Sequence, residues 1–550
     1  MKNATLIIAF ALLFNLGYAQ QQDDAGLAAR FDKMMLEQFK AGGTGATVLV
    51  ARKGDIIYKK AFGMANLELD VPMQVDNVFR IASLTKQFTA IAILQLMEQG
   101  KLNLEDEIGK VIPGYPTQGA KITIEHLLTH TSGITDYTSL RDTVKKEALD
   151  YTPSQMIDRF KNLPLRFAPG TRWEYSNSGY FLLGYIIERL TGKTYAEYLE
   201  ENIFKRLQMT SSLFASDIKL IKKRAAGYTE GETGYQNPPY LSMTQPYAAG
   251  AILSTVEDLF KWHQAVIANK LVKQESLNKA FARYKLTDGK ETAYGYGWRI
   301  GSVYESLSIW HGGLINGFKS MAVYLPREDV YVALLSNCDC SSPEVVTPKL
   351  AALAAGRPYE YKALASANNN LLEYTGVYEN GKGQQRIITV SDNQLFSQLG
   401  RGPRSSIRAF QKDQFFFDAD AMSTIAFTRN KTGGIEKLTT ENIRGNEVWN
   451  KSGKPLPNED GIKLADRVLE TILGMYEVSP DFAFSITKEQ SRLYLLATGQ
   501  EKVELFAETP SLFFLKVNDA QLQFVKDATG KVTKAILKQG GRETDAKKIK

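Results

Sequence analysis

The chain has 550 residues, more than one hydrophobic core usually serves, so several domains are expected. Hydrophobic residues make up 44% and charged residues 23%, a balance typical of folded proteins that excludes wholesale disorder. The net charge of +7 is spread along the chain apart from a short Lys-rich end, 547–550, and no aromatic and basic stripe accompanies it, which argues against nucleic-acid binding.

The first residues have the pattern of an export signal. Lys2 precedes a largely apolar stretch from Ala4 to Gly17, and Gly17 and Ala19 put small residues where a signal peptidase cuts. This stretch is shorter than the roughly 20 residues that span a bilayer. We therefore expect a signal peptide over 1–19, cleavage near Ala19, and a periplasmic or secreted protein without stable membrane insertion.

Strand and helix patterns alternate over the first 355 or so residues. Thr47–Ala51 and Asp55–Lys60 are typical of two short strands joined by a Lys-Gly hairpin turn. A helix is predicted from about Ser83 to Gln99, ended by Gly100. Its apolar residues go nearly all the way round, so we expect this helix to be buried.

Further elements follow in the same region. A helix is predicted over Ser178–Leu190, and another begins near Ser254 or Thr255, where a capping pattern occurs. The remaining strand-like segments are Tyr296–Ile300, Leu307–Trp310, Lys319–Leu325 and Val330–Ser336.

The character of the sequence changes near Ala355. Residues 356–370 end in three consecutive asparagines and are interpreted as a linker. Short alternating segments with turn residues follow, which is typical of small all-β modules. We place one module over 371–449, a polar, proline-containing linker over 450–463, and a second module over 464–550.

The two modules resemble each other in sequence. Three landmarks recur in the same order, at offsets of 98, 98 and 97 positions. The matching pairs are Gly376 and Gly474, Phe415-Phe416 and Phe513-Phe514, and Phe427–Gly433 and Phe524–Gly530. A near-constant offset indicates a duplicated module.

Ser83 and Lys86 open the buried helix in the order Ser-Leu-Thr-Lys. Residues three apart share a helix face, so the Lys86 amine can reach the Ser83 hydroxyl. A serine needs a neighbouring base to become a nucleophile, and a buried lysine can serve because burial lowers its pKa. The free N–H groups of a helix start also favour negative charge beside Ser83. By itself, the pattern occurs readily by chance and favours an ordinary helix cap.

Two later segments strengthen the case for chemistry at Ser83. Tyr175-Ser176-Asn177 directly precedes a predicted helix; a phenol can carry protons, and an asparagine can bind a substrate carbonyl while holding the lysine. The alternative for Tyr175 is a core aromatic residue. His311-Gly312-Gly313 follows a strand-like segment, where glycines let a substrate backbone lie close to N–H groups that can form an oxyanion hole.

Serine, lysine, tyrosine, asparagine and His-x-Gly in this order resemble the penicillin-recognising serine hydrolases, which include class C β-lactamases, DD-carboxypeptidases, D-aminopeptidases and related esterases. The resemblance covers roughly Gly42 to Leu353. Other segments that carry it are Phe79–Lys86, His126–Ile134, Ala249–Thr255 and Tyr294–Trp298.

The resemblance implies a role for each matched residue. Ser83 would form an acyl-enzyme, with Lys86 and Tyr175 moving its proton to the leaving group. Asn177 would orient the substrate.

On the strand side of the site, His311 would take the place of the lysine in the family's Lys-Thr-Gly triplet, with Gly313 completing that triplet. The backbone N–H groups of Ser83 and Leu314 would form the oxyanion hole. Histidine at this position is familiar among the peptidases and esterases of the group, so β-lactamase activity is not expected to be the main function.

The resemblance also implies an α+β fold: a β-lactamase/transpeptidase-like catalytic domain over 20–355, with an antiparallel sheet, flanking helices and a helical insertion, followed by two β-barrel or lipocalin-like modules. Small peptides or amides are the expected substrates, with a D-residue favoured, and no metal or organic cofactor is implied. A short-chain esterase and a β-lactamase are alternatives within the family. A non-catalytic protein that binds peptide or glycan is the alternative of another class, and the oligomeric state is left open.

Two motifs invite a different interpretation. Lys431-Thr432-Gly433 is a literal Lys-Thr-Gly, but its counterpart in the second module is Ala528-Thr529-Gly530, so we interpret it as a hairpin turn. His126 and His130 have the spacing of a helical zinc site but lack its neighbouring glutamate and a third ligand. We expect these histidines to make structural hydrogen bonds near the site.

The chain has two cysteines, Cys338 and Cys340, separated by one residue. A disulfide across one residue is expected to be strained, and a metal or redox site is an alternative. We predict ordinary thiols that follow the strand-like run Tyr331–Ser336.

Overall fold

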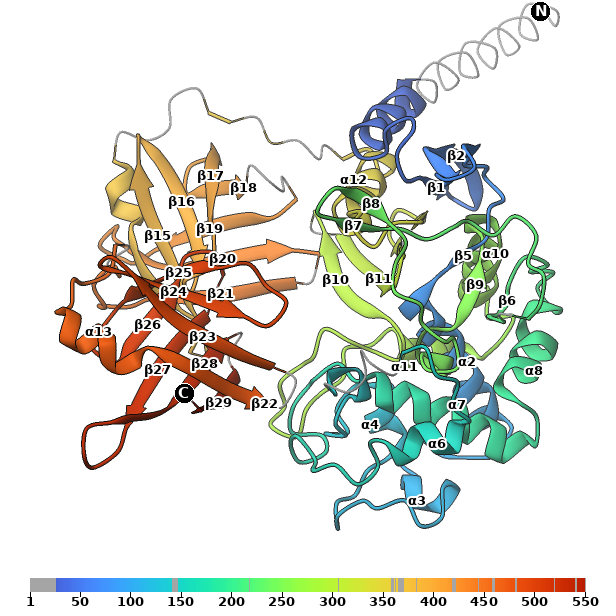
Figure 1. Cartoon of the computed structure of the whole chain (residues 1–550). Helices are drawn as coiled ribbons and strands as arrows, with labels where there is room; N and C mark the ends of the chain where they lie inside the picture. The colour runs from blue at the N-terminus through green and yellow to red at the C-terminus, as the bar shows by residue number, and fades with distance from the viewer. Residues whose placement is uncertain are drawn as a thin grey trace, which may run out of the picture. The chain divides into compact units, whose positions relative to one another are not determined.

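A computed structural model describes residues 26–549, except 141–146, 217, 305, 358–360, 362, 365–369, 382, 418–421, 444, 458–459, 480–481, 519 and 540–541. The chain forms two compact units, Met1–Tyr359 with Ile443–Gly445, and Glu360–Asn442 with Asn446–Lys550 (Figure 1). The predicted α+β fold followed by two barrels is confirmed.

A six-stranded antiparallel sheet forms the framework of the first unit. Its order, β10-β11-β12-β13-β1-β2, places the N-terminal hairpin beside the last strand of the unit. Strand β13 is buried at every residue, because α10 and α12 pack against it and its neighbour β1. The strands are β1 (Ala46–Arg52), β2 (Asp55–Phe62), β10 (Arg299–Val303), β11 (Ser306–Ile315), β12 (Phe318–Leu325) and β13 (Val330–Ser336).

A group of helices packs around α7 in the same unit. Helix α7 begins after Ser176, whose side chain accepts a hydrogen bond from Gly179 N, and ends at Gly192, which has a φ of +69°. Helices α2, α4, α6, α8 and α9 contact it; Figure 1 shows α4, α6 and α8 near α7. The helices are α2 (Thr85–Glu98), α3 (Ile108–Val111), α4 (Ile124–Leu128), α6 (Pro153–Asp158), α7 (Asn177–Thr191), α8 (Tyr195–Leu199), α9 (Tyr247–Gly250), α10 (Val256–Ile267), α11 (Gln274–Ala280) and α12 (Pro343–Ala354).

Short elements connect the sheet to these helices. Strand β9 lies between β5 and β6 in a three-stranded sheet, while β3 pairs with β4 and β7 with β8. These strands are β3 (Met64–Asn66), β4 (Val71–Pro72), β5 (Phe79–Arg80), β6 (Leu213–Phe214), β7 (Thr229–Gly231), β8 (Gly234–Gln236) and β9 (Ile252–Ser254). The short helical turns are η1 (Ala82–Leu84), η2 (Tyr137–Ser139) and η3 (Glu200–Phe204).

The second unit contains two closed eight-stranded barrels, each with its strands in sequence order. The turn η4 (Leu371–Tyr374) precedes the first barrel, and α13 (Asp466–Ile472) precedes the second. The first consists of β14 (Gly376–Glu379), β15 (Gln385–Ser391), β16 (Gln394–Leu399), β17 (Arg404–Gln411), β18 (Gln414–Phe417), β19 (Thr424–Arg429), β20 (Ile435–Asn442) and β21 (Gly445–Lys451). The second consists of β22 (Gly474–Ser479), β23 (Phe482–Glu489), β24 (Arg492–Ala497), β25 (Val503–Ala507), β26 (Leu512–Leu515), β27 (Ala520–Lys526), β28 (Val532–Gln539) and β29 (Arg542–Lys548).

The same closing contacts occur in both barrels. In the first, the Tyr378 hydroxyl donates to the Tyr374 carbonyl at 2.7 Å, and Lys451 Nζ donates to the Glu373 carbonyl at 3.0 Å. In the second, Tyr476 donates to the Ile472 carbonyl at 2.8 Å and Lys548 to the Thr471 carbonyl at 3.0 Å. The repeat seen in the sequence is therefore a repeat of structure.

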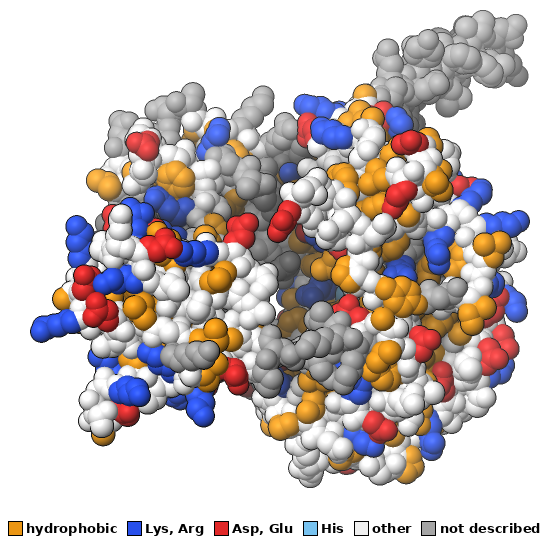
Figure 2. Space-filling model, viewed as in Figure 1, with side chains coloured by type: hydrophobic (Ala, Val, Ile, Leu, Met, Phe, Trp, Pro, Cys, Tyr) orange, Lys and Arg blue, Asp and Glu red, His pale blue; other side chains and the backbone are white. Residues whose placement is uncertain are grey.

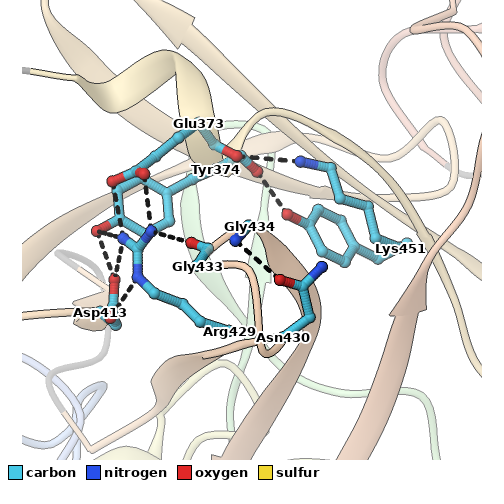
Figure 3. Close-up of polar contacts among 9 residues, drawn as sticks. Glu373, Tyr374, Asp413, Arg429, Asn430, Gly433, Gly434 and Lys451 are labelled. Carbon is cyan, nitrogen blue, oxygen red and sulfur yellow. Dashed lines mark hydrogen bonds and ion pairs between the residues drawn. The ribbon is translucent and has the colours of Figure 1, made fainter.

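The literal Lys-Thr-Gly is a hairpin turn, as predicted; Figure 3 shows Asn430, Gly433 and Gly434 of this turn. It lies between β19 and β20, where Asn430 Oδ1 accepts hydrogen bonds from Thr432 N and Gly434 N, both at 3.0 Å, and Gly433 has a φ of +88°. In the second barrel, Asp527 Oδ1 caps the equivalent turn in the same way.

Beside this turn, a polar network links η4, the turn between β17 and β18, and the end of β19. Arg429 forms ion pairs with Glu373 and Asp413, and it donates to the Gly433 carbonyl at 2.9 Å (Figure 3). Asp413 also accepts from the Tyr374 hydroxyl at 2.8 Å. The second barrel has Lys526, Ser511 and Thr471 at the corresponding positions, so this network belongs to the first barrel alone.

The prediction of two free thiols is wrong, because Cys338 and Cys340 form a disulfide. The chain turns directly after β13 and brings the two Cα atoms to 5.1 Å, within the range that a disulfide bridges. Between the two cysteines, Asp339 Oδ2 accepts a hydrogen bond from Gly317 N at 2.8 Å, in the turn between β11 and β12.

The predicted signal peptide lies outside the described residues. In the part of the chain that is described, the helices are too short or too polar to cross a membrane. Basic and acidic side chains are interspersed over the surface seen in Figure 2.

Candidate active site

Ser83 lies in η1, the short turn that leads into α2. Ala82 before it has a φ of +48°, a conformation that non-glycine residues rarely adopt. Neighbouring strands hold this turn in place: Ile81 N donates to the Ile252 carbonyl at 3.0 Å, and Ser320 Oγ donates to the Ile81 carbonyl at 2.8 Å. Ser83 is therefore presented from a backbone anchored on both sides.

Lys86 is fully buried and points toward Ser83. Its Nζ lies 3.3 Å from Ser83 Oγ, 2.8 Å from Asn177 Oδ1 and 2.9 Å from the Ala249 carbonyl. Burial lowers the pKa of Lys86 to about 7; the charge of Asp136 opposes this shift and that of Arg299 adds to it. The amine is therefore partly neutral at physiological pH.

Tyr175 lies against Lys86, whose Nζ is 4.8 Å from the centre of its ring. Burial raises the pKa of Tyr175, while a hydrogen bond with Ser83 and the charge of Arg299 lower it. The net effect is upward, so the phenol keeps its proton and acts as a neutral donor and acceptor.

His130 positions the segment around Tyr175. Glu174 N donates to the His130 carbonyl at 3.0 Å, and Ser176 N donates to His130 Nδ1 at 3.1 Å. The His130 ring lies 4.3 Å from the Tyr175 ring. Burial holds the pKa of His130 well below its usual range, so the ring is neutral and can accept from Ser176.

His126 has a separate structural role. Its Nδ1 accepts a hydrogen bond from Thr123 N at 3.3 Å, which completes a capping box at the start of α4. The expectation of structural hydrogen bonds for both histidines is confirmed. Among the described residues, no cluster of three or more His, Cys, Asp or Glu side chains is arranged to hold a metal ion.

Asn177 links Lys86 to the carboxylate of Asp136. While its Oδ1 accepts from Lys86, its Nδ2 donates to Asp136 Oδ2 at 3.2 Å. This contact sets the orientation of the amide, because a donor faces the acid and the acceptor faces the amine.

His311 lies on β11 and is buried next to the Tyr175 ring, 6.2 Å between ring centres. Its Nε2 and the Tyr294 hydroxyl are 2.9 Å apart, and its Nδ1 is 2.6 Å from the Gly312 carbonyl. Burial and the charges of Arg299 and Lys86 hold the pKa of His311 well below its usual range. The residue at the lysine position of the triplet is therefore neutral, with Nδ1 donating and Nε2 accepting.

Gly313 allows β11 to approach η1. A Cβ added at Gly313 would lie 2.5 Å from the Ile81 carbonyl oxygen and 2.9 Å from Ala82 Cβ. Leu314, the next residue, is 63% exposed and lines the same cleft as Ser83. The structure thus brings together all seven residues singled out in the sequence, from Ser83 to Leu314.

The cleft at Ser83 has about 690 Å³ of empty space, including its open mouth. Asn177, Ala249 and Leu314 line it together with side chains from η2 and from the segment before α9. Among the described residues that line it, Glu147 is the charged one.

Sequence reasoning missed three charged residues of this region: Asp136, Glu147 and Arg299. The guanidinium of Arg299 lies 5.5 Å from the ring centres of Trp173, Tyr175 and Trp310. Arg299 directly follows the motif Tyr294–Trp298, which could have drawn attention to it. Asp136 lies two residues after the motif segment His126–Ile134, whereas Glu147 follows no motif and reaches the site only through the tertiary fold.

Sequence comparisons identify a protein family and relatives of this chain. The profile of the Beta-lactamase family matches residues 28–356. The chain is 29% identical over 407 residues to penicillin-binding protein 4* of Bacillus subtilis, covering 68% of this chain and 88% of that protein. It is 31% identical over 295 residues to the putative penicillin-binding protein PbpX of the same organism, covering 54% of this chain and 71% of the relative.

Solved structures share the fold. An octameric penicillin-binding protein homologue from Pyrococcus abyssi is 25% identical, with a TM-score of 0.54, over 77% of this chain and 99% of that one. D-amino acid amidase from Ochrobactrum anthropi SV3 is 24% identical, with a TM-score of 0.53, over 61% of this chain and 98% of that one.

Proposed function

The chain belongs to the Beta-lactamase family, and we propose that it is an exported serine hydrolase that cleaves small peptides or amides through an acyl-enzyme on Ser83. The observation that carries the proposal is the buried Lys86 amine, 3.3 Å from Ser83 Oγ and with a pKa lowered to about 7. A base with this pKa can accept the serine proton near neutral pH.

Acylation begins when neutral Lys86 takes the Ser83 proton while Oγ bonds to the substrate carbonyl carbon. The carbonyl oxygen gains negative charge, which the N–H groups of Ser83 and Leu314 stabilise. As the bond to the leaving amine breaks, Tyr175 passes the proton from Lys86 to that nitrogen. Asn177 holds Lys86 in place and donates to the substrate through its amide.

Deacylation reverses these roles. Water gives a proton to the lysine–tyrosine pair as its oxygen bonds to the acyl carbon. The ester bond to Ser83 Oγ then breaks, Oγ regains a proton and the acid product leaves. The residues in the site supply every proton transfer of both half-reactions.

The neutral state of His311 favours peptide, amide or ester substrates over β-lactams. A lysine at this position would present a permanent positive charge to a β-lactam carboxylate, whereas a buried histidine with a lowered pKa presents none. We favour substrates with a D-residue, and the D-amino acid amidase named above shares the fold.

Export is supported by the N-terminal segment, where Lys2 precedes the apolar stretch Ala4–Gly17. We propose that the protein works in a periplasm or outside the cell on small soluble substrates. The spread of charge along the chain does not favour nucleic acid as a partner.

The test is turnover by the purified mature protein and its Ser83→Ala variant on a matched panel. The panel holds a D-Ala-D-Ala peptide, a D-aminoacyl amide with its L-form, a short acyl ester and a chromogenic cephalosporin. We expect the D-amide or D-peptide to be hydrolysed best and Ser83→Ala to lose at least about a thousandfold in kcat. Ser154→Ala, at an exposed serine of α6 outside the cleft lining, should keep full activity.

Other results would change the proposal in defined ways. Preference for the ester or the cephalosporin would make the protein an esterase or a β-lactamase with the same mechanism. Full activity in Ser83→Ala, or no turnover by the unaltered protein, would contradict the mechanism and favour a protein that binds peptide or glycan.

A further inference from the structure

A second groove of the first unit lies beside the loop 216–224, which follows β6. It has about 1340 Å³ of empty space, including open solvent, and it shares no lining residue with the cleft at Ser83. Residues of η3, of β6 and of this loop line it, and one ion pair in the lining joins Lys205 to Glu200 at 3.6 Å. The reaction proposed for Ser83 makes no use of this groove.

Apolar side chains form a continuous part of the chemistry of this groove. Val78, Phe204 and Met209 line it and are buried, while Leu213 and Ile221 line it and are half-buried. Removing such surface from water is favourable, so the groove suits a partner that brings hydrocarbon.

Two large aliphatic side chains of the loop are open to solvent. Ile218 is 100% exposed and Leu220 is 86% exposed. The backbone that carries them is held, because Ser216 Oγ accepts hydrogen bonds from Ile218 N at 3.3 Å and from Lys219 N at 3.1 Å. Single exposed aliphatic residues are common, but two in one held loop beside an apolar groove indicate an interaction surface.

The same loop has an excess of positive charge. Over 216–224 the sequence has one acid, Asp217, and four cations, which are Lys219, Lys222, Lys223 and Arg224. The structure describes every residue of the loop except Asp217, and the net charge of +3 already counts that acid. Nine residues thus hold close to half of the net charge of +7 of the whole chain.

Ion pairs occupy only part of this charge. Lys223 pairs with Asp76, which lies in the same groove lining. Lys219 and Lys222 are exposed, and neither forms an ion pair with an acid in the described part of the chain. Their ammonium groups are therefore available to an anionic partner beside the exposed aliphatic side chains.

We propose that the loop 216–224 docks the protein reversibly on the surface of a bilayer that contains anionic lipid. Ile218 and Leu220 enter the boundary between headgroups and acyl chains, and Lys219 and Lys222 contact the headgroup phosphates. A soluble acidic polymer would match the charge but would gain little from the aliphatic side chains, so we favour the lipid surface. The inference is independent of the reaction at Ser83.

The test is co-sedimentation of the purified mature protein with two kinds of vesicle, phosphatidylcholine alone and phosphatidylcholine mixed equally with phosphatidylglycerol. We expect binding to the mixed vesicles only, and weaker binding as salt screens the surface charges. The double variant Lys219→Glu/Lys222→Glu should bind the mixed vesicles at least about tenfold more weakly. Ile218→Ser/Leu220→Ser should show a loss of similar size, because the apolar contribution is removed.

Matched controls change the same residue types at exposed positions outside the groove lining. Leu69→Ser, at a leucine that is 73% exposed, and Lys101→Glu/Lys270→Glu should bind like the unaltered protein. The thermal midpoint of every variant, followed by circular dichroism, should match that of the unaltered protein. A loss of vesicle binding then reports the surface rather than the fold.

Several results would overturn the inference. They are equal binding to neutral and mixed vesicles, no binding to either, or full binding by both loop variants. Capture by soluble polyglutamate as tight as binding to the mixed vesicles, and unchanged in Ile218→Ser/Leu220→Ser, would identify an acidic polymer as the partner and would also overturn it. None of these results bears on Ser83, so the proposed function is tested separately.

Discussion

At the residue scale, the state of the site depends on the charges around Lys86. Burial is the main reason that its pKa falls to about 7, and Asp136 and Arg299 act on it in opposite directions. Asp136 contacts Asn177, which also binds Lys86, while Arg299 lies over the ring of Tyr175. A substitution at Asp136 or at Arg299 can therefore change the pKa of Lys86 while Ser83 stays unaltered.

This arrangement predicts the pH dependence of the reaction. Lys86 must be neutral to accept the serine proton, so kcat/KM should fall about tenfold per pH unit below about 7 and level off above it. An N-acetyl or ester substrate suits the measurement because it has no titrating amine.

Arg299→Gln should move the fall of kcat/KM at acid pH, the acid limb of the profile, to higher pH. The reason is that a charge that lowers the pKa of Lys86 is removed. Asp136→Asn should move it to lower pH for the opposite reason. A limb that stays in place in both variants would show that Lys86 is not the group that titrates.

At the element scale, the close packing of β11 on η1 positions the residues proposed as the oxyanion hole. Gly313 permits this contact, because a Cβ there would meet the Ile81 carbonyl at 2.5 Å. Gly312, one residue earlier, has room for a Cβ: the nearest atom to it would be the Ser320 carbonyl oxygen, at an ordinary contact distance of 3.6 Å. A methyl group therefore fits at Gly312 but clashes at Gly313.

Gly313→Ala should therefore separate β11 from η1 and lower kcat by roughly a hundredfold, the size of effect seen when one oxyanion donor is lost. Gly312→Ala introduces the same methyl group without a clash and should lower kcat by less than about threefold. Steady-state kinetics on the preferred substrate give the comparison, and similar losses in both variants would contradict this role of β11.

Local motifs predicted most of the elements that carry the site. The hairpin of β1 and β2 and the buried helix α2 were found from patterns only a few residues long. Helix α2 begins at Thr85 rather than Ser83, because Ala82 has a positive φ and Ser83 lies in a tighter turn. Such backbone detail comes from packing against β9 and β12, which no local pattern contains.

Contacts between distant segments were the main thing that sequence patterns could not predict. Glu147 contacts Asn316, which lies 169 positions later in the chain. The disulfide of Cys338 and Cys340 was missed for a different reason, because it depends on a turn that closes the distance between neighbouring cysteines. In contrast, the order of Ser83, Tyr175 and His311 was enough to indicate the family.

At the scale of the whole molecule, the chain is built around separate hydrophobic cores. One lies in the catalytic unit around α2 and α7, one in the first barrel around Tyr374 and Trp449, and one in the second around Tyr476 and Phe513. These clusters share no residue. Because these cores are separate, we expect unfolding of the chain to depart from a single two-state transition.

Calorimetry should therefore resolve more than one transition. Trp449→Ala removes a side chain that is 1% exposed, and we expect it to destabilise the first barrel by about 3 to 5 kcal/mol. One transition should move to lower temperature, while the temperature at which hydrolytic activity is lost should stay unchanged. A shift of every transition together would show that the cores unfold as one unit.

The pairing of first and last strands in each barrel, β14 with β21 and β22 with β29, bears on how the nascent chain avoids misassembly. As synthesis proceeds, β14 keeps an open edge until β21 has emerged, and the related strands of the next barrel follow soon after. Tandem domains of similar sequence are prone to exchanging strands. Here both last strands carry a lysine, Lys451 or Lys548, that could make the closing hydrogen bond in either barrel. The ion pairs of Arg429 with Glu373 and Asp413 have no counterpart in the second barrel, so they can form only when β19 assembles with the other segments of the first barrel.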